Sequence, residues 1–386
     1  MSKAFGRNRI CVIADDLTGA CDAAAPFARR GARTTVVLQP AEPGFGSPGT
    51  EVQALCTGTR HVAPEKAAEV VRGLARDLDT GEFDQIFKKI DSVFRGNTFI
   101  EIAAAICALP RRFAVIAPAF PALGRICTDG ELHVQDLSGS RSLPLRKQLS
   151  EAGLEPAWIA PMRDIRELEA EMRAAISRGS NAVFCEATSD DELLAVVEAS
   201  RALDKPILWV GSGGLAHALA QTLYSSSSNT NAGRAAPEIA DGVLLAFTGS
   251  EHSVSMRQFA LLRKQHSIRD WPATTASRFA APVNIFQVER GQTTDAQIRE
   301  AVYSIELDDV GCLLMNGGET ALQVCRALGI GSINLKGEFE TGIPIGLASG
   351  GRFDGCTVIL KSGGFGDADL LSRIAGHCAY GKELTT

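Results

Sequence analysis

The sequence predicts an α/β protein of two domains, each a mostly parallel sheet flanked by helices. Three observations support this fold class. Short β-type runs alternate with longer segments of helical periodicity, as in parallel strands joined by crossover helices. The length of 386 residues exceeds what one hydrophobic core usually organises. A polar stretch rich in Ser, Asn, Ala and Pro interrupts the alternation after residue 224.

The front half of the chain repeats strand and helix several times. Its strands are short apolar runs, and its helices carry apolar residues three or four positions apart. Gly31 is expected to end the first helix, and Pro64 to open the second. In chain order we predict strand 9–14, helix 18–30, strands 33–38 and 52–56, helix 64–78, strand 85–89, helix 98–109, strand 113–118, strand 182–185, helix 190–203, strand 207–210 and a glycine-led helix that ends at Leu223.

The domain boundary is placed in residues 225–241, because SSSSNTNAGRAAPEIAD has no apolar periodicity. This segment is predicted to be a linker between an N-terminal domain, 1–224, and a C-terminal domain, 242–386. The α/β pattern resumes after it, with strands expected at 243–247, 311–315 and 358–361.

Composition excludes several functional classes. A formal net charge of -6 and the absence of basic runs interleaved with aromatics argue against a nucleic-acid partner. The ten cysteines are scattered singly with no metal spacing, so we expect buried thiols in a reducing compartment. The opening residues lack the apolar core of a signal peptide, and no apolar run has membrane-spanning length. We therefore expect a cytoplasmic protein with no membrane partner.

A first polar motif, IADDLTGA at residues 13–20, lies where the first strand meets the first helix. Ligands bind at the carboxyl ends of strands in open α/β sheets, and a helix N-terminus favours anions. Asp15 and Asp16 cannot both be caps of one helix. The alternative is that one aspartate caps the helix and the pair has no other role.

A second motif, KKIDSVFRGN at residues 88–97, follows another predicted strand. Its lysines, carboxylate, hydroxyl and arginine suit a hydroxy acid, which needs a carboxylate clamp and hydrogen bonds to hydroxyls. A polar loop with a surface ion pair is the alternative. A third motif, TGTR at residues 57–60, places Arg60 after a neighbouring strand, where it could reach the same site, although a solvated arginine is the commoner explanation.

The back half carries glycine-rich turns at residues 248–250, 316–320 and 362–366. Each follows a predicted strand, and exposed backbone amides before a helix attract phosphate. No Walker A loop or protein-kinase signature occurs. Ordinary tight turns are the alternative, since glycine occurs 38 times. His252 is interpreted as an exposed histidine, and the turn at 210–214 as a packing turn, not a dinucleotide site.

Taken in order, ADDLTGA, TGTR, KIDSVFRGN, TGS, GGET and KSGGFG resemble the landmarks of the four-carbon acid sugar kinase family. They run from residue 14 to residue 366, so the resemblance covers nearly the whole chain. It implies an N-terminal domain that binds a tetronate-type sugar acid and a C-terminal domain that binds ATP, with the active site in the interdomain cleft. The substrate-binding residues that it implies are Asp16, Arg60, Lys89, Asp91, Ser92 and Arg95. The nucleotide-binding residues that it implies are Ser250, Gly317, Gly318, Glu319, Thr320 and Gly363.

Two segments depart from the family pattern. Where the family usually has a DST-type triplet followed by a small residue or leucine, this chain has Asp91, Ser92, Val93 and Phe94, and we expect Phe94 to reshape the acid pocket. Residues 251–255 differ from the expected Ser/Pro-containing run, although Ser255 and Gln258 keep matching positions.

The mechanism that the resemblance implies is phosphoryl transfer by positioning and charge neutralisation. Arg60 and Arg95 would fix the substrate carboxylate, and Asp16, our first choice, or Asp91 would accept the proton of the attacking hydroxyl. Mg²⁺ would bridge the ATP phosphates with few protein ligands, and no metal ligand is assigned. The alternatives are a sugar-acid-binding protein without transfer activity and a nicotinamide-dependent dehydrogenase. The sequence leaves open whether the chain forms a homo-oligomer.

Overall fold

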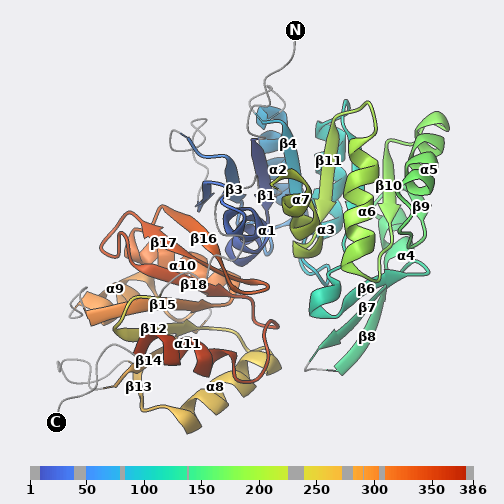
Figure 1. The fold of residues 1–386 in the computed structure, drawn as a ribbon. Coiled ribbons are helices and arrows are strands. Elements are labelled where there is room, and N and C mark those ends of the chain that lie inside the picture. Colours follow the sequence, from blue (N-terminus) through green and yellow to red (C-terminus); the bar gives the residue numbers. More distant parts are fainter. Residues whose placement is uncertain are drawn as a thin grey trace. The chain divides into compact units, whose positions relative to one another are not determined.

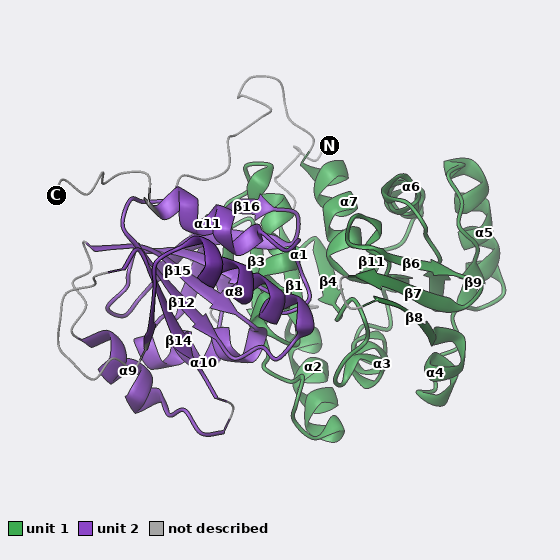
Figure 2. Cartoon of the chain, turned by 90° about the horizontal axis from the view of Figure 1, so that it is seen from below, with its two compact units in different colours: residues 1–35, 39–230 green, residues 36–38, 231–386 purple. Residues whose placement is uncertain are grey.

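The computed structural model describes residues 9–38, 49–78, 83–136, 139–224, 239–271, 281–289, 291–303 and 309–379. Two compact units make up the chain, residues 1–35 with 39–230 and residues 36–38 with 231–386 (Figure 2). Both are α/β, which confirms the predicted fold class. Most of the predicted linker, 225–241, lies outside the described residues, so its limits stay a prediction.

The first unit is built on a parallel sheet whose strands follow the order β3-β1-β4-β11-β5-β10-β9. The strands are β1 (Ile10–Ala14), β3 (Val52–Cys56), β4 (Gln85–Lys89), β5 (Phe113–Ala117), β9 (Ala157–Ile159), β10 (Ala182–Cys185) and β11 (Ile207–Gly211), with β2 (Thr34–Val37) preceding β3. β1 lies between β3 and β4, so the carboxyl ends of these three strands share one edge.

Helices flank this sheet, as Figure 1 shows. They are α1 (Leu17–Arg29), α2 (Pro64–Leu78), α3 (Thr98–Ala108), α4 (Leu145–Glu151), α5 (Ile165–Ser177), α6 (Asp190–Arg201) and α7 (Gly213–Leu223). A Cβ on Gly211 would lie 2.6 Å from the Ala117 carbonyl oxygen, and one on Gly213 2.5 Å from the Phe120 ring. The glycines before α7 therefore permit close packing, which confirms the interpretation of residues 210–214.

A small antiparallel sheet in the first unit was not predicted. It follows the 3-10 helix η1 (Pro121–Leu123) and consists of β6 (Arg125–Thr128), β7 (Glu131–Asp136) and β8 (Gly139–Pro144), as Figure 1 shows. Nearly all of β8 is exposed. Because such a strand has no apolar face, hydrophobic periodicity gives no signal for it.

The second unit has a mixed sheet in the order β13-β14-β12-β15-β18-β17-β16. Its strands are β12 (Val243–Thr248), β13 (Ile268–Trp271), β14 (Val283–Gln287), β15 (Val310–Asn316), β16 (Ser332–Glu340), β17 (Ile343–Ser349) and β18 (Thr357–Lys361). Its helices are α8 (Ser253–Gln265), α9 (Asp295–Tyr303), α10 (Gly318–Leu328) and α11 (Leu370–Ala379). β12, β15 and β18 are adjacent and parallel, so the turns that follow them lie together.

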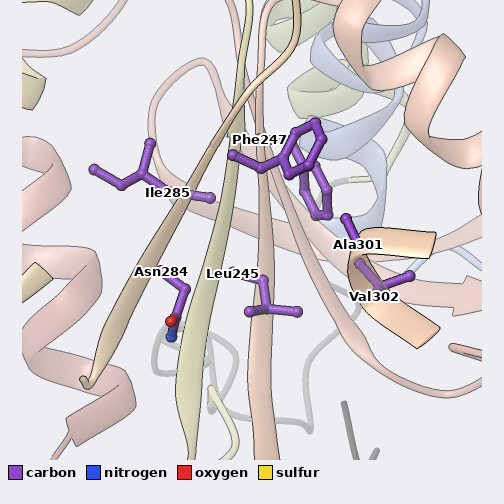
Figure 3. Close-up of a pocket in the computed structure, with 8 residues that line it drawn as sticks. Leu245, Phe247, Asn284, Ile285, Ala301 and Val302 are labelled. Atoms are coloured by element: carbon purple, nitrogen blue, oxygen red, sulfur yellow. The ribbon is translucent and has the colours of Figure 1, made fainter. Parts of the chain in front are cut away.

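A small apolar pocket lies in the second unit between β12, β14 and α9 (Figure 3). Its polar lining residue is Asn284, whose Nδ2 donates to the Ala281 carbonyl at 3.1 Å. The other lining residues are apolar and come from β12, β14 and α9. Among the described residues, none from the glycine-rich turns 248–250, 316–320 and 362–366 lines this pocket.

The helices and the cysteines of the described residues bear on two expectations from the sequence. Within the described ranges, none of the helices has both the length and the apolar character needed to cross a bilayer. The ten cysteines are free thiols, and most are buried. This confirms the expectation of buried thiols.

Candidate functional site

Arg60 stands at the centre of a buried charge cluster in the first unit. Its Nε and Nη2 donate to Asp15 at 2.6 and 2.8 Å, and its Nη1 donates to Asp16 Oδ2 at 2.5 Å. Its Nη2 also lies 3.5 Å from Asp91 Oδ2. Asp15 and Asp16 follow β1, Arg60 follows β3, and Asp91 follows β4, so these residues converge because the three strands are neighbours.

The Arg60 side chain is only 10% exposed, so the alternative of a solvated arginine is wrong. Burial disfavours its charge, but Asp16, Asp15 and Asp91 outweigh burial and raise the pKa of Arg60 well above its ordinary value. The guanidinium is therefore a fixed cation. Most of its donors are already used by carboxylates of the protein.

Asp16 has two roles in the structure. It is the N-cap of α1, where its Oδ1 accepts from the Gly19 N–H at 2.7 Å, and its Oδ2 accepts from Thr18 Oγ1 at 3.0 Å. The same Oδ2 accepts from Arg60. A Cβ on Gly19 would lie 2.6 Å from Asp16 Oδ1, so glycine permits this close approach. Helix capping thus accounts for Oδ1 of Asp16 only. Its Oδ2 contacts Arg60, so the alternative that Asp16 serves only as a cap does not explain this ion pair.

Asp91 organises the turn after β4. Its Oδ1 accepts from the N–H groups of Val93 and Arg95 at 3.0 and 3.1 Å, and its Oδ2 accepts from Arg95 Nη2 at 2.6 Å. Burial alone would raise the pKa of Asp91, but Arg95 and Arg60 outweigh burial and hold this pKa well below its ordinary value. Asp91 is therefore a firmly ionised carboxylate.

Two side chains of this turn remain available to a ligand. The Arg95 side chain is 52% exposed, in contrast to Arg60. The Ser92 hydroxyl has no hydrogen-bond partner within the described ranges. A cation and a hydroxyl beside an ionised network suit an acid that also carries hydroxyl groups.

Phe94 packs into the interior of the first unit, and its effect on the acid pocket stays a prediction. It is 6% exposed, and its ring stacks on Phe99 with centroids 5.1 Å apart. Its φ of 60° is in the left-handed region, which is costly for an aromatic residue. This conformation bends the chain between Asp91 and Arg95, so Phe94 anchors the turn in the interior.

Lys89 and its neighbour Lys88 are buried and paired with carboxylates. Lys89 Nζ lies 3.3 Å from Asp22 Oδ2, and Lys88 Nζ lies 2.8 Å from Glu101 Oε2. Asp22 belongs to α1 and Glu101 to α3, and neither was singled out from the sequence. Helical periodicity gives no signal for a buried carboxylate whose partner lies on a distant strand. The predicted substrate contact Lys89 thus already has an acidic partner.

The predicted nucleotide-binding residues of the second unit come together at the ends of β12, β15 and β18. A Cβ on Gly317 would lie 3.7 Å from Ser250 Cβ and 3.5 Å from Thr320 Oγ1. A Cβ on Gly363 would collide with Ser250 Oγ. These residues occur in three different turns, so the structure places the predicted turns side by side.

The first turn of α10 offers uncapped backbone amides. Gly317 is its N-cap with a φ of 102°, a conformation that favours glycine, and no side chain caps the helix. Gly318 and the exposed Glu319 begin the helix, and Thr320 is buried. The Gly317 N–H is already bonded to the Lys361 carbonyl at 2.8 Å. The later amides of this turn are therefore the ones that suit an anion.

His252 is not the exposed histidine expected from the sequence. It is half-buried, and as the N-cap of α8 its Nδ1 accepts from the Val254 N–H at 3.2 Å. A Cβ on Gly364 would lie 3.2 Å from its ring. Histidine is an uncommon N-cap residue, so a sequence pattern does not predict this role.

Ser255 and Gln258 extend from α8 toward the turn after β18. Ser255 Oγ lies 2.8 Å from the Gly363 carbonyl, and Gln258 Nε2 donates to the carbonyls of Phe365 and Asp367 at 3.1 and 2.6 Å. Both side chains are fully buried. They hold the backbone of the turn, which is a supporting role.

No described cluster of three or more His, Cys, Asp or Glu side chains is arranged to hold a metal ion. The oxygens of the second-unit set are the hydroxyls of Ser250 and Thr320 and the carboxylate of Glu319. Hard cations such as Mg²⁺ take oxygen ligands of these types.

Two family models match this chain, one in each half. Residues 10–219 match the family described as "Sugar-binding N-terminal domain", and residues 245–371 match "Nucleotide-binding C-terminal domain". A D-threonate kinase of Cupriavidus necator is 32% identical over 86% of this chain and 89% of its own length. A 3-oxo-tetronate kinase of Pseudomonas fluorescens is 27% identical over 96% of this chain and 97% of its own length. A D-erythronate kinase of Heliobacterium modesticaldum is 26% identical over 94% of this chain and 95% of its own length.

Solved structures share the fold. A Salmonella typhimurium protein described as a tRNA synthase aligns with a TM-score of 0.71 at 23% identity, over 95% of this chain and 98% of its own. A Haemophilus influenzae protein aligns with a TM-score of 0.67 at 20% identity, over 95% of this chain and 99% of its own. At these identities the likeness concerns the fold alone.

Proposed function

Because the chain belongs to the four-carbon acid sugar kinase family, we propose that it transfers the γ-phosphoryl group of ATP to a hydroxyl of a four-carbon sugar acid. Threonate, erythronate and 3-oxo-tetronate are the candidate acceptors, after the names of the relatives. One observation carries the proposal. The arginine–carboxylate cluster lies in the sugar-binding match, and the grouped glycine turns lie in the nucleotide-binding match.

The first unit is proposed to bind the acid. Arg95 supplies an exposed guanidinium for the substrate carboxylate, and Ser92 supplies a free hydroxyl for a substrate hydroxyl. Arg60 contributes a fixed positive charge near Asp91, the carboxylate that Arg95 also contacts, while its donors bind Asp15 and Asp16. Lys89 contributes through its ion pair with Asp22. Such a network needs no rearrangement when the ligand arrives, which lowers the cost of binding.

Asp16 is proposed to accept the proton of the attacking hydroxyl. A general base works best when its pKa lies near the operating pH. Asp91 is a poor candidate, because two arginines hold its pKa well below the ordinary range. Asp16 has one arginine contact, a backbone contact and a hydroxyl contact, and it lies at the same sheet edge. Its carboxylate would polarise the hydroxyl while the arginines neutralise charge.

The second unit is proposed to bind ATP through the grouped turns. The amides of Gly363 and of the first turn of α10, with the hydroxyls of Ser250 and Thr320, suit the phosphates. Gly317 and Gly318 allow the backbone to approach, and Glu319 lies at the helix start. Mg²⁺ would be held mainly by phosphate oxygens and water, with Glu319 as the nearby carboxylate, and would neutralise phosphate charge.

A coupled assay of ADP release tests the proposal, with threonate, erythronate and 3-oxo-tetronate as acceptors and no acid as the control. Acid-dependent ADP release with at least one acceptor is the expected result. If none of the three acids increases ADP release, the proposed activity is refuted. The alternative of a binding protein without transfer is not favoured, because the relatives are named as kinases. We place the activity in the cytoplasm, where ATP is supplied and thiols stay reduced.

A further inference from the structure

The carboxyl end of β18 carries a buried lysine with an unusual environment. Lys361 is the last residue of β18 and is fully buried. Two other buried lysines, Lys88 and Lys89, each pair with a carboxylate. Lys361 contacts no carboxylate within the described ranges, and its partners are neutral oxygens. Burying an ammonium without a counter-ion is costly, so its retention suggests a role.

Four oxygens surround the ammonium of Lys361. Its Nζ lies 3.0 Å from the Ser362 carbonyl, 3.1 Å from Ser255 Oγ, 3.1 Å from Asn316 Oδ1 and 3.2 Å from the Gly363 carbonyl. Asn316 Nδ2 in turn donates to Thr248 Oγ1 at 2.9 Å. The ammonium therefore fastens together the ends of β12, β15 and β18 and the start of α8.

These contacts fix the direction of two peptide groups. In a trans peptide the C=O and the N–H point in opposite directions. The carbonyls of Ser362 and Gly363 point toward Lys361, so the N–H groups of Gly363 and Gly364 point away from it. Neither N–H has a hydrogen-bond partner within the described ranges. Two such amides in succession form an anion-binding nest.

The main chain of Lys361 makes a second link. Its carbonyl accepts from the Gly317 N–H at 2.8 Å, which joins the turn after β18 to the start of α10. The same residue thus holds two of the three turns proposed to bind phosphate. A positive charge buried beneath them is weakly screened and attracts an anion above.

We propose that Lys361 is a positioning residue for the nucleotide phosphates, which turns the Gly363 and Gly364 amides outward and, in its protonated form, supplies a positive charge behind them. The ligand class is a nucleoside polyphosphate, and the inference rests on the proposed function. Lys361 is too deeply buried to touch the ligand, so it acts through the backbone.

The test compares ADP with adenosine, which lacks phosphate. Lys361→Met keeps the length of the side chain and removes the ammonium. Ile359→Val is the matched control, because Ile359 lies on the same face of β18 and is buried. Calorimetric titration of each variant gives both affinities. We expect Lys361→Met to weaken ADP by about tenfold or more and adenosine by less than about twofold.

Steady-state kinetics adds a second readout. The KM for ATP should rise in Lys361→Met while the KM for the acid stays unchanged, and Ile359→Val should alter neither. If Lys361→Met fails to fold, the same affinities are measured with Ser255→Ala. This variant removes the hydroxyl that contacts both the Gly363 carbonyl and Lys361 Nζ.

A folded Lys361→Met protein whose ADP and adenosine affinities change by the same factor, or not at all, would overturn the positioning role. A wild-type protein that binds no ADP would instead refute the proposed nucleotide site. The two failures are therefore distinguishable.

Discussion

The guanidinium of Arg60 holds the carboxylate of Asp15 in a bidentate ion pair, with Nε 2.6 Å from Oδ2 and Nη2 2.8 Å from Oδ1. Both groups are buried, and Asp16 and Asp91 lie on the same arginine. Charges removed from water are costly unless they are paired. Arg60 therefore holds three carboxylates of the proposed acid site in place.

Removing Arg60 should destabilise the protein strongly. Arg60→Met leaves the carboxylates of Asp15 and Asp16 buried without their counter-charge, and we expect a loss of about 3–5 kcal/mol in the free energy of unfolding. Urea denaturation measures this loss. The control is Arg263→Met, since Arg263 makes an equally close bidentate pair with Asp270 on the surface. That change should cost about 1 kcal/mol or less, and equal losses in the two variants would contradict the account.

Arg95 should act on the substrate rather than on the fold. Its exposed guanidinium is the proposed contact for the substrate carboxylate, so Arg95→Met should raise the KM for the acid by about tenfold or more. The KM for ATP should stay unchanged. Arg95→Lys keeps the charge but not the forked geometry and should give an intermediate KM. An unchanged KM for the acid in Arg95→Met would remove Arg95 from the substrate site.

Asp16→Asn tests the proposed base. Asparagine still caps a helix, so α1 should keep its N-terminus. The loss of the carboxylate should lower kcat by about 10²–10⁴-fold with little change in ATP affinity. Single-turnover kinetics with saturating acid measures the chemical step. A rate equal to that of the wild type would exclude Asp16 as the proton acceptor.

The stability of the protein should rise with pH above neutrality because of Lys361. Burial lowers the pKa of Lys361 to about 7 from its ordinary value of 10.5. Between these values the unfolded chain binds the proton that the folded chain has lost, so the unfolding free energy rises with pH, by up to about 1.4 kcal/mol per pH unit. Lys361→Met should remove this slope. Urea denaturation between pH 7 and pH 9 measures the unfolding free energy of the wild type and of Lys361→Met. If this free energy changes with pH equally in both proteins, the lowered pKa of Lys361 is contradicted.

Much of the fold follows from local sequence patterns. The predicted limits 52–56, 64–78, 85–89 and 182–185 match β3, α2, β4 and β10, because these elements have a buried face and clear turn or cap residues at their ends. β6 to β8 were not predicted. β8 is exposed along almost its whole length, and β6 and β7 are short strands in which polar residues are at least as common as apolar ones.

The sequence predicts where the polar motifs of the candidate site gather, but not which of their side chains form ion pairs. Strand ends in an α/β sheet indicate where polar motifs gather, and the structure brings Asp16, Arg60 and Asp91 together as expected. The sequence cannot show that Arg60 is surrounded by carboxylates or that Lys89 is paired with Asp22, because these partners are far apart in the chain. Lys361 was missed for the same reason. Its environment is formed by residues of three separate elements.

Phosphorus NMR of the reaction mixture tests the central claim most directly. The protein is incubated with ATP, Mg²⁺ and each candidate acid, and the phosphorus signals are followed with time. The account predicts a new phosphomonoester signal that grows with ADP, depends on the acid and is greatly slowed in Asp16→Asn. Release of inorganic phosphate alone, or no loss of ATP with any acid, would contradict it.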